Sequence, residues 1–130
     1  MENVNIKRIA VTRKSLYLYW LTFLKPYHKL RQQEIETMAL FLYYRYQLSE
    51  EVSNQDLVDK LLFSADTKKS IMQDLNISNN YVFNNLLSTL RKKGVITKDN
   101  KINPVLIPSI SKDSLNFKLI FNFELKDDTK

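Results

Sequence analysis

The sequence offers little for acid–base or metal chemistry. His28 is the single histidine, and no carboxylate stands at a telling spacing from it. The chain has no cysteine, which excludes thiolate metal sites and disulfides. The acid pairs Glu34/Glu36 and Glu50/Glu51 fall at expected helix starts or in loops, where the helix dipole favours acids. With no glycine-rich phosphate loop and no nucleophile signature, we expect no enzyme, no cofactor and no metal.

Electrostatic binding is the chemistry that the sequence does favour, because its net charge of +6 is unevenly placed. Residues 1–31 hold seven Lys/Arg and one acid, and residues 67–101 hold seven Lys/Arg and two acids. Residues 32–66 reverse the balance, with two Lys/Arg and seven acids. This pattern is expected of a nucleic-acid binder. A solvated surface would also suit these lysines, and charge alone does not separate the two interpretations.

Composition indicates one helical domain. Hydrophobic residues make up 44% of the 130 residues, enough for a packed core, and one glycine and three prolines leave few helix breakers. The apolar runs at residues 16–24 and 38–44 are too short to cross a bilayer, which takes about 20 residues. The first residues lack a signal-peptide pattern. We therefore expect a soluble, cytoplasmic protein with no membrane partner.

Several helices precede the basic region. Residues 4–12 read as a short strand or an extended arm, and residues 15–24 as a helix capped by Ser15 and stopped by Pro26. A helix over residues 32–47 is apolar nearly all round, which places it in the core or against a partner. A short helix follows Asn54, and residues 64–66 cap the next one.

Residues 71–78 have the spacing of a helix followed by a tight turn. Ile71 and Leu75 bury the helix, and Asn76 tolerates the left-handed backbone that such a turn needs. Ile77 fills the turn, and Ser78 is placed to cap a second helix.

The second helix is amphipathic, and the pattern after it changes period. Phe83, Leu87 and Leu90 recur at steps of four and three, and Gly94 ends the helix. Residues 95–97 and 101–108 read as two strands joined by a turn at residues 98–101. The tail alternates from Leu115 to residue 125, which predicts a half-buried strand.

The stretch "LNIS…F…L..LRKKGVI" resembles the winged helix-turn-helix superfamily. Upstream, "HKLRQQEIETMALFLY" resembles the helix that precedes this motif in bacterial and phage regulators. The resemblance covers roughly residues 30 to 108 and departs in two places: Phe83 anchors the second helix one residue late, and Arg31 replaces a capping threonine. It implies a mainly α fold with a small β-sheet. Residues 1–31 would form an N-terminal arm and helix, residues 32–108 the winged core, and residues 109–130 a C-terminal strand and tail.

The same resemblance implies where DNA would bind. The second helix would lie in the major groove, where asparagine amides can pair with adenine. Its exposed positions would be Ser78, Asn79, Asn80, Asn84, Asn85 and Ser88. Phosphate contacts would come from Arg91, Lys92 and Lys93, and a wing tip from Lys98, Asn100 and Lys101. Polar filler on a solvent face, with a basic helix end that complements the dipole, explains the same residues without DNA.

We expect a DNA-binding protein, either a small transcription regulator or a replication accessory protein of a phage, plasmid or bacterium. Double-stranded DNA would be its partner, and a homodimer or other oligomer would form through the aromatic helices. The alternative is a non-enzymatic assembly protein, for example a virion component, that uses the scaffold for protein contacts. The apolar residues of the second helix, where arginine is common, favour that alternative.

Overall fold

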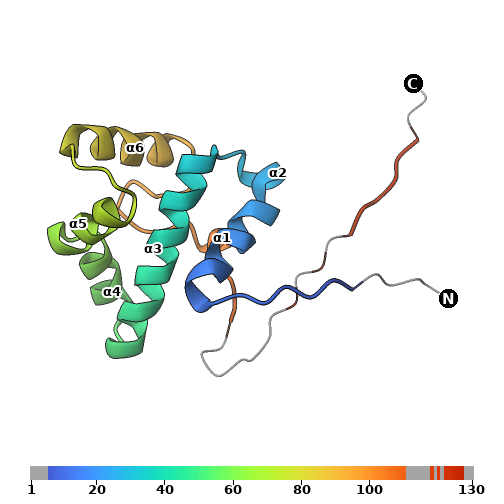
Figure 1. Ribbon diagram of the computed structural model, residues 1–130, viewed down its shortest axis with the longest axis horizontal. Coiled ribbons are helices and arrows are strands. Elements are labelled where there is room, and N and C mark those ends of the chain that lie inside the picture. Colours follow the sequence, from blue (N-terminus) through green and yellow to red (C-terminus); the bar gives the residue numbers. More distant parts are fainter. Residues whose placement is uncertain (1–5, 111–117, 119, 121, 128–130) are drawn as a thin grey trace.

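Helix α3 (Gln32–Glu51) lies at the centre of the fold (Figure 1). In the computed structural model, which describes residues 6–110, 118, 120 and 122–127, it packs against α1 (Arg13–Phe23) on one side. On the other side it packs against α4 (Gln55–Leu62) and α5 (Ala65–Asp74). The last helix, α6 (Asn80–Lys92), crosses near the start of α3.

The central position of α3 explains why apolar residues occur on nearly all of its sides. Ile35, Met38 and Phe41 are fully buried within the chain, and the Phe41 ring stacks on Phe63 with ring centroids 5.1 Å apart. Such burial removes the apolar area from water without a partner subunit. The aromatic helices therefore do not by themselves require an oligomer, and the oligomer stays a prediction.

The N-terminal residues were predicted to form either a short strand or an extended arm, and those that the structure describes form the arm. Residues 6–12 are exposed and have no regular structure. Helix α1 is capped by Thr12, which exchanges hydrogen bonds with Ser15 in a capping box, so Ser15 is not itself the cap. Pro26, which was predicted to stop the helix, does not end helical structure either. It lies in the first turn of the short helix α2 (Lys25–His28), where its missing N–H costs nothing.

The predicted caps of α4 and α5 are confirmed. The Asn54 side chain accepts a hydrogen bond from the Leu57 N–H at 3.2 Å, and α4 begins at the next residue. Ser64 accepts from the Thr67 N–H at 3.4 Å at the start of α5. Both residues satisfy backbone donors that a helix start leaves open.

The predicted winged helix with a small β-sheet is wrong. Within residues 6–110, 118, 120 and 122–127 there is no β-strand, and the two expected strands meet in one antiparallel bridge, Ile96 with Ile102. Of the predicted tail strand, Lys118, Ile120 and residues 122–125 are exposed and without regular structure. Its other positions, including Leu115 and Phe117, lie outside the described residues.

The local sequence explains why the pairing stops after one bridge. Before it, the N–H groups of Val95 and Ile96 bond back to the Leu90 carbonyl at the end of α6. The bridge itself includes the bond from the Asn103 N–H to the Val95 carbonyl at 3.0 Å. The next residue, Pro104, begins a turn of 3-10 helix, η1 (Pro104–Leu106). Because proline has no N–H, it cannot extend a ladder. The alternation of apolar residues predicted strands that the flanking residues prevent.

The end of η1 is held against α1. The indole Nε1 of Trp20 donates to the Leu106 carbonyl at 2.8 Å, and the Leu106 side chain is buried. Among the described residues, no helix is both long enough and apolar enough to cross a membrane.

Candidate nucleic-acid interface

The turn between α5 and α6 has the backbone that the sequence predicted at Asn76. This residue has a φ of 58°, and the Ile77 N–H then bonds to the Met72 carbonyl at 2.9 Å. The cap of α6, however, is Asn79 rather than Ser78. The Asn79 side chain accepts from the Tyr81 N–H at 2.8 Å, because the turn is long enough to place Asn79 directly before the helix.

Helix α6 buries one face and exposes a polar one. Phe83, Leu87 and Leu90 are at most 1% exposed, as their spacing predicted. The remaining predicted base-reading residues are exposed: Ser78, Asn80, Asn84, Asn85 and Ser88. Helix α6 contains no acidic residue. Its outer face therefore offers hydrogen-bonding groups without a carboxylate that would repel phosphate.

The predicted basic residues divide by their partners. Lys92 and Lys98 are exposed at the end of α6 and in the turn that follows. Lys93 instead pairs with the buried Glu34 at 2.7 Å. Lys101 lies 3.9 Å from both Asp56 and Asp99, in exposed and therefore weak ion pairs. The local supply of free positive charge is thus smaller than the sequence suggests.

Arg91 and Asn100 hold the turn at residues 97–101 against the end of α6. The guanidinium of Arg91 donates to the Asn100 Oδ1 from two nitrogens, at 2.8 Å and 3.2 Å. Asn100 itself has a φ of 59°, a left-handed backbone that asparagine tolerates. The predicted wing tip is therefore a single fixed turn beside the helix.

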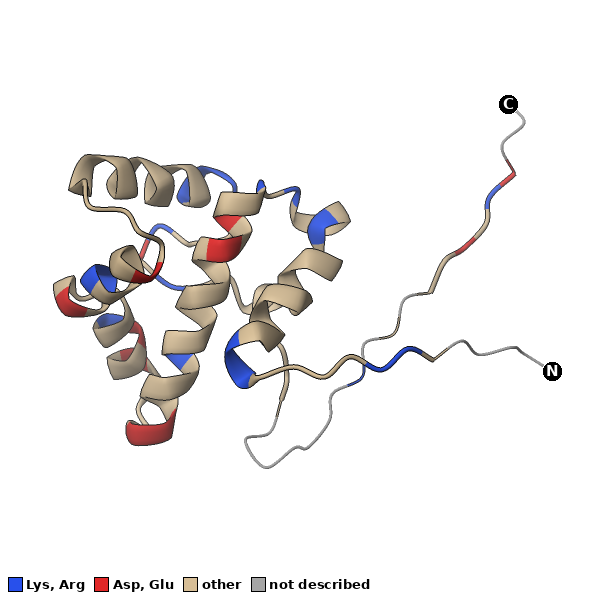
Figure 2. Ribbon diagram, in the orientation of Figure 1, with Lys and Arg blue, Asp and Glu red and all other residues tan. Residues whose placement is uncertain are grey.

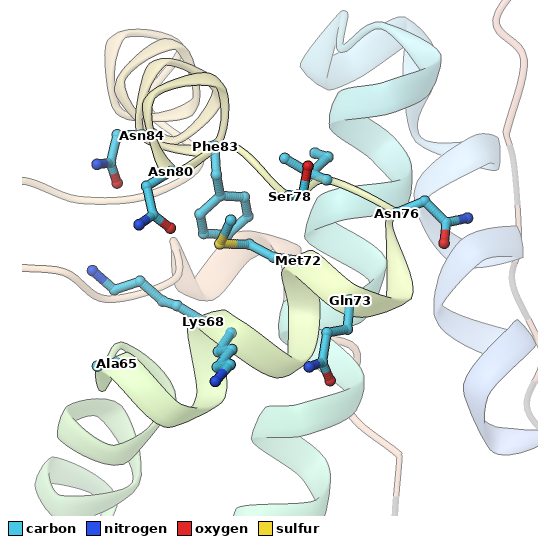
Figure 3. Close-up of a pocket in the computed structure, with 11 residues that line it drawn as sticks. Ala65, Lys68, Met72, Gln73, Asn76, Ser78, Asn80, Phe83 and Asn84 are labelled. Atoms are coloured by element: carbon cyan, nitrogen blue, oxygen red, sulfur yellow. The ribbon is translucent and has the colours of Figure 1, made fainter.

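A groove of about 920 Å³ separates α5 from the first turns of α6. Figure 3 shows Asn80 and Asn84 on its α6 side, Lys68 on its α5 side, and Phe83 together with Met72 between the two helices. Of the described residues that line it, none is acidic. Amides and amines thus converge on one open surface.

Lys68 and Lys69 in this groove were missed by the sequence reasoning. Both line the groove, and Lys69 is exposed. The signal that could have found them is spacing. Lys68 lies four residues before the buried Met72, so it shares a helix side with a residue that packs toward α6.

The basic N-terminal arm lies elsewhere. Residues 6–12, which include Lys7 and Arg8, extend from the start of α1 away from α5 and α6 (Figure 2). The basic residues of the arm therefore do not adjoin those of α5 and α6.

His28 is built into the fold. Its Nδ1 accepts from the Leu30 N–H at 3.0 Å, so in the neutral ring the proton is on Nε2, which donates to the Leu21 carbonyl at 2.6 Å. Burial lowers the pKa of His28, and the charge of Lys25 adds to that effect, while the bond to Leu21 opposes it. In the part of the chain that the structure describes, no three His, Cys, Asp or Glu side chains gather as metal ligands.

Comparisons with protein-family models, curated proteins and solved structures found no match for this chain.

Proposed function

We propose that the protein binds double-stranded DNA through α6, which would lie in the major groove. One observation carries the proposal: the exposed amides of α6 lie on a helix that has two lysines beside its first turns, one lysine at its end and no carboxylate of its own. Lys68 and Lys69 lie on the α5 side, and Lys92 lies at the helix end. Positive charge beside the start of a helix and at its end is placed to contact the phosphate strands that border a groove.

Each side chain has a role in this proposal. Lys68, Lys69 and Lys92 contact phosphates and supply affinity without sequence preference. Asn80, Asn84, Asn85 and Ser88 face base edges and supply specificity. The resemblance of roughly residues 30 to 108 to helix-turn-helix proteins supports this division. It favours a regulator or replication accessory protein working in the cytoplasm, as a dimer on two half-sites.

A titration of a mixed-sequence duplex at several salt concentrations tests the proposal. For the triple variant Lys68→Gln/Lys69→Gln/Lys92→Gln we expect the slope of log affinity against log salt to become shallower by about three units. The matched control Lys7→Gln/Lys25→Gln/Lys29→Gln removes the same charge from the arm, from α2 and from the residue after it. In this control most of the dependence of log affinity on log salt should remain. No binding by the wild type at low salt, or equal effects of the two triples, would contradict the proposal.

Assembly through protein contacts is the second candidate, and one observation favours it. Tyr81 and Val82 are 73% and 46% exposed on the first turn of α6. Exposed apolar residues next to each other often mark a protein contact. Light scattering of the wild type and of Tyr81→Ala at equal concentration separates the two: a complex that Tyr81→Ala dissociates supports assembly.

A further inference from the structure

The apolar residues at the start of α6 have no place in the core. Tyr81 is 73% exposed and Val82 is 46% exposed, whereas Phe83 beside them is 1% exposed. Large apolar side chains that point into water are unfavourable by the area that they leave hydrated. Both lie in the first helical turn, the part of a groove-bound helix that reaches base edges.

The neighbours of Tyr81 and Val82 on the helix surface are amides. Asn84 and Asn85 follow Tyr81 by three and four residues, so all three side chains share one side of α6. Asn84 and Asn85 are exposed. The side that would enter a groove therefore combines hydrogen-bonding groups with an apolar patch.

One base pair presents both matching chemistries in the major groove. Adenine offers an N7 acceptor and an N6 donor, which an amide can bond in a bidentate manner. Its partner thymine offers a C5-methyl group, the apolar group of that groove. Lys68 and Lys69 beside the first turns of α6, and Lys92 at its end, match the charge of the flanking phosphates.

We infer that Tyr81 and Val82 contact thymine methyl groups, so that α6 reads both bases of A·T pairs. The inference rests on the proposed DNA binding and names its substrate as A·T-rich duplex. It also accounts for apolar residues where the helix would otherwise carry arginine, the residue that pairs with guanine.

Duplexes that differ only in the methyl group test the inference. The wild type is titrated against an alternating A·T duplex and against the same duplex with deoxyuridine in place of thymidine. We expect the deoxyuridine duplex to bind about fourfold more weakly for each methyl group that the protein buries. For Tyr81→Ala/Val82→Ala, we expect the difference between the duplexes to disappear.

The control is Tyr27→Ala, since Tyr27 is 65% exposed on α2 and outside the proposed interface. It should keep the wild-type preference for thymine. Circular dichroism of each variant confirms that it is folded, as expected for exposed positions.

The other outcomes overturn the inference in distinguishable ways. Equal binding of both duplexes by the wild type would reject the methyl contact and leave DNA binding standing. A preference for thymine that survives in the double variant would reject these two residues as its source. No binding to either duplex at low salt would reject DNA binding and this inference together. If light scattering then shows a protein complex that Tyr81→Ala/Val82→Ala dissociates, the exposed face of α6 binds protein instead.

Discussion

Lys93 and Glu34, 59 positions apart in the chain, form an ion pair with 2.7 Å between Nζ and Oε1. The pair joins the end of α6 to the first turn of α3. Glu34 is 4% exposed and also accepts from the Arg31 N–H at 2.8 Å. Burial raises the pKa of Glu34, but the hydrogen bonds from Lys93 and Arg31 and their charges outweigh it, so that pKa lies below its ordinary value.

Removing the amine should destabilise the fold. In Lys93→Met the Glu34 carboxylate keeps only its backbone partner, and we expect the free energy of unfolding at pH 7 to fall by about 1–3 kcal/mol. Urea denaturation gives this value. The matched control is Lys92→Met, which changes an exposed neighbour and should stay within about 0.5 kcal/mol of wild type. Equal stability of the two variants would show that the ion pair contributes nothing.

The same two lysines should differ in DNA binding. Lys92 is exposed, whereas Lys93 would have to leave Glu34 before it could reach a phosphate. In Lys92→Gln we expect the slope of log affinity against log salt to become shallower by about one unit. In Lys93→Gln we expect a much smaller change. Fluorescence anisotropy with a labelled duplex measures both slopes, and a larger effect of Lys93→Gln would reverse the assignment.

Local signals in the sequence predicted much of the helical part of the fold. Asn54 and Ser64 cap helices because their short side chains reach free N–H groups, a relation within three residues. Asn76 and Gly94 adopt positive φ as their types suggest. The prediction of strands after Gly94 was wrong because alternation alone does not show that the pairing is limited to one bridge, which ends where Pro104 begins a turn.

The candidate site was predictable only in part. The exposed face of α6 follows from the spacing of Phe83, Leu87 and Leu90. The partner of Lys93 does not, because Glu34 is brought to it by the packing of two distant helices. The contribution of Lys68 to the groove also depends on how α5 is set against α6.

The two faces of α6 should respond differently to truncation. Phe83 is 1% exposed in the core, and Phe83→Ala should cost about 3–5 kcal/mol, enough to unfold a marginal domain. Asn85 is exposed, and Asn85→Ala should change stability by less than about 0.5 kcal/mol. Thermal melts compare the two. A folded Phe83→Ala with near-wild-type stability would contradict the packing of α6.

Glycine should be required at position 94 for its backbone conformation rather than for the absence of a side chain. Its φ is +79°, and a Cβ atom built there would meet nothing within 4 Å. In Gly94→Ala we expect a loss of about 1–2 kcal/mol from the left-handed conformation alone. Gly94→Asn should lose less, because asparagine tolerates that region. Equal losses in urea denaturation would point to a cause other than the backbone.

His28 should make stability depend on pH near neutrality. Its Nδ1 can accept from the Leu30 N–H only while the ring is neutral, whereas Nε2 can donate to the Leu21 carbonyl in either form, and burial is the main reason that its pKa lies below 6.5. Below pH 6.5 the unfolded chain binds the proton more readily than the folded one. The stability that the neutral ring supplies is therefore complete above pH 6.5 and is lost as the pH falls through the lowered pKa.

The variant His28→Ala separates this effect from other acids. Truncation leaves the Leu30 N–H and the Leu21 carbonyl without this partner, so we expect a loss of about 1–3 kcal/mol at pH 7.5. Because protonation of His28 removes part of its stabilising effect in the wild type, the difference in free energy of unfolding between the two proteins should be smaller at pH 5. Urea denaturation at both pH values measures it. The carboxylates are common to both proteins, so their titration cancels, and a difference that stays constant with pH would show that His28 keeps the same protonation preference when folded and unfolded.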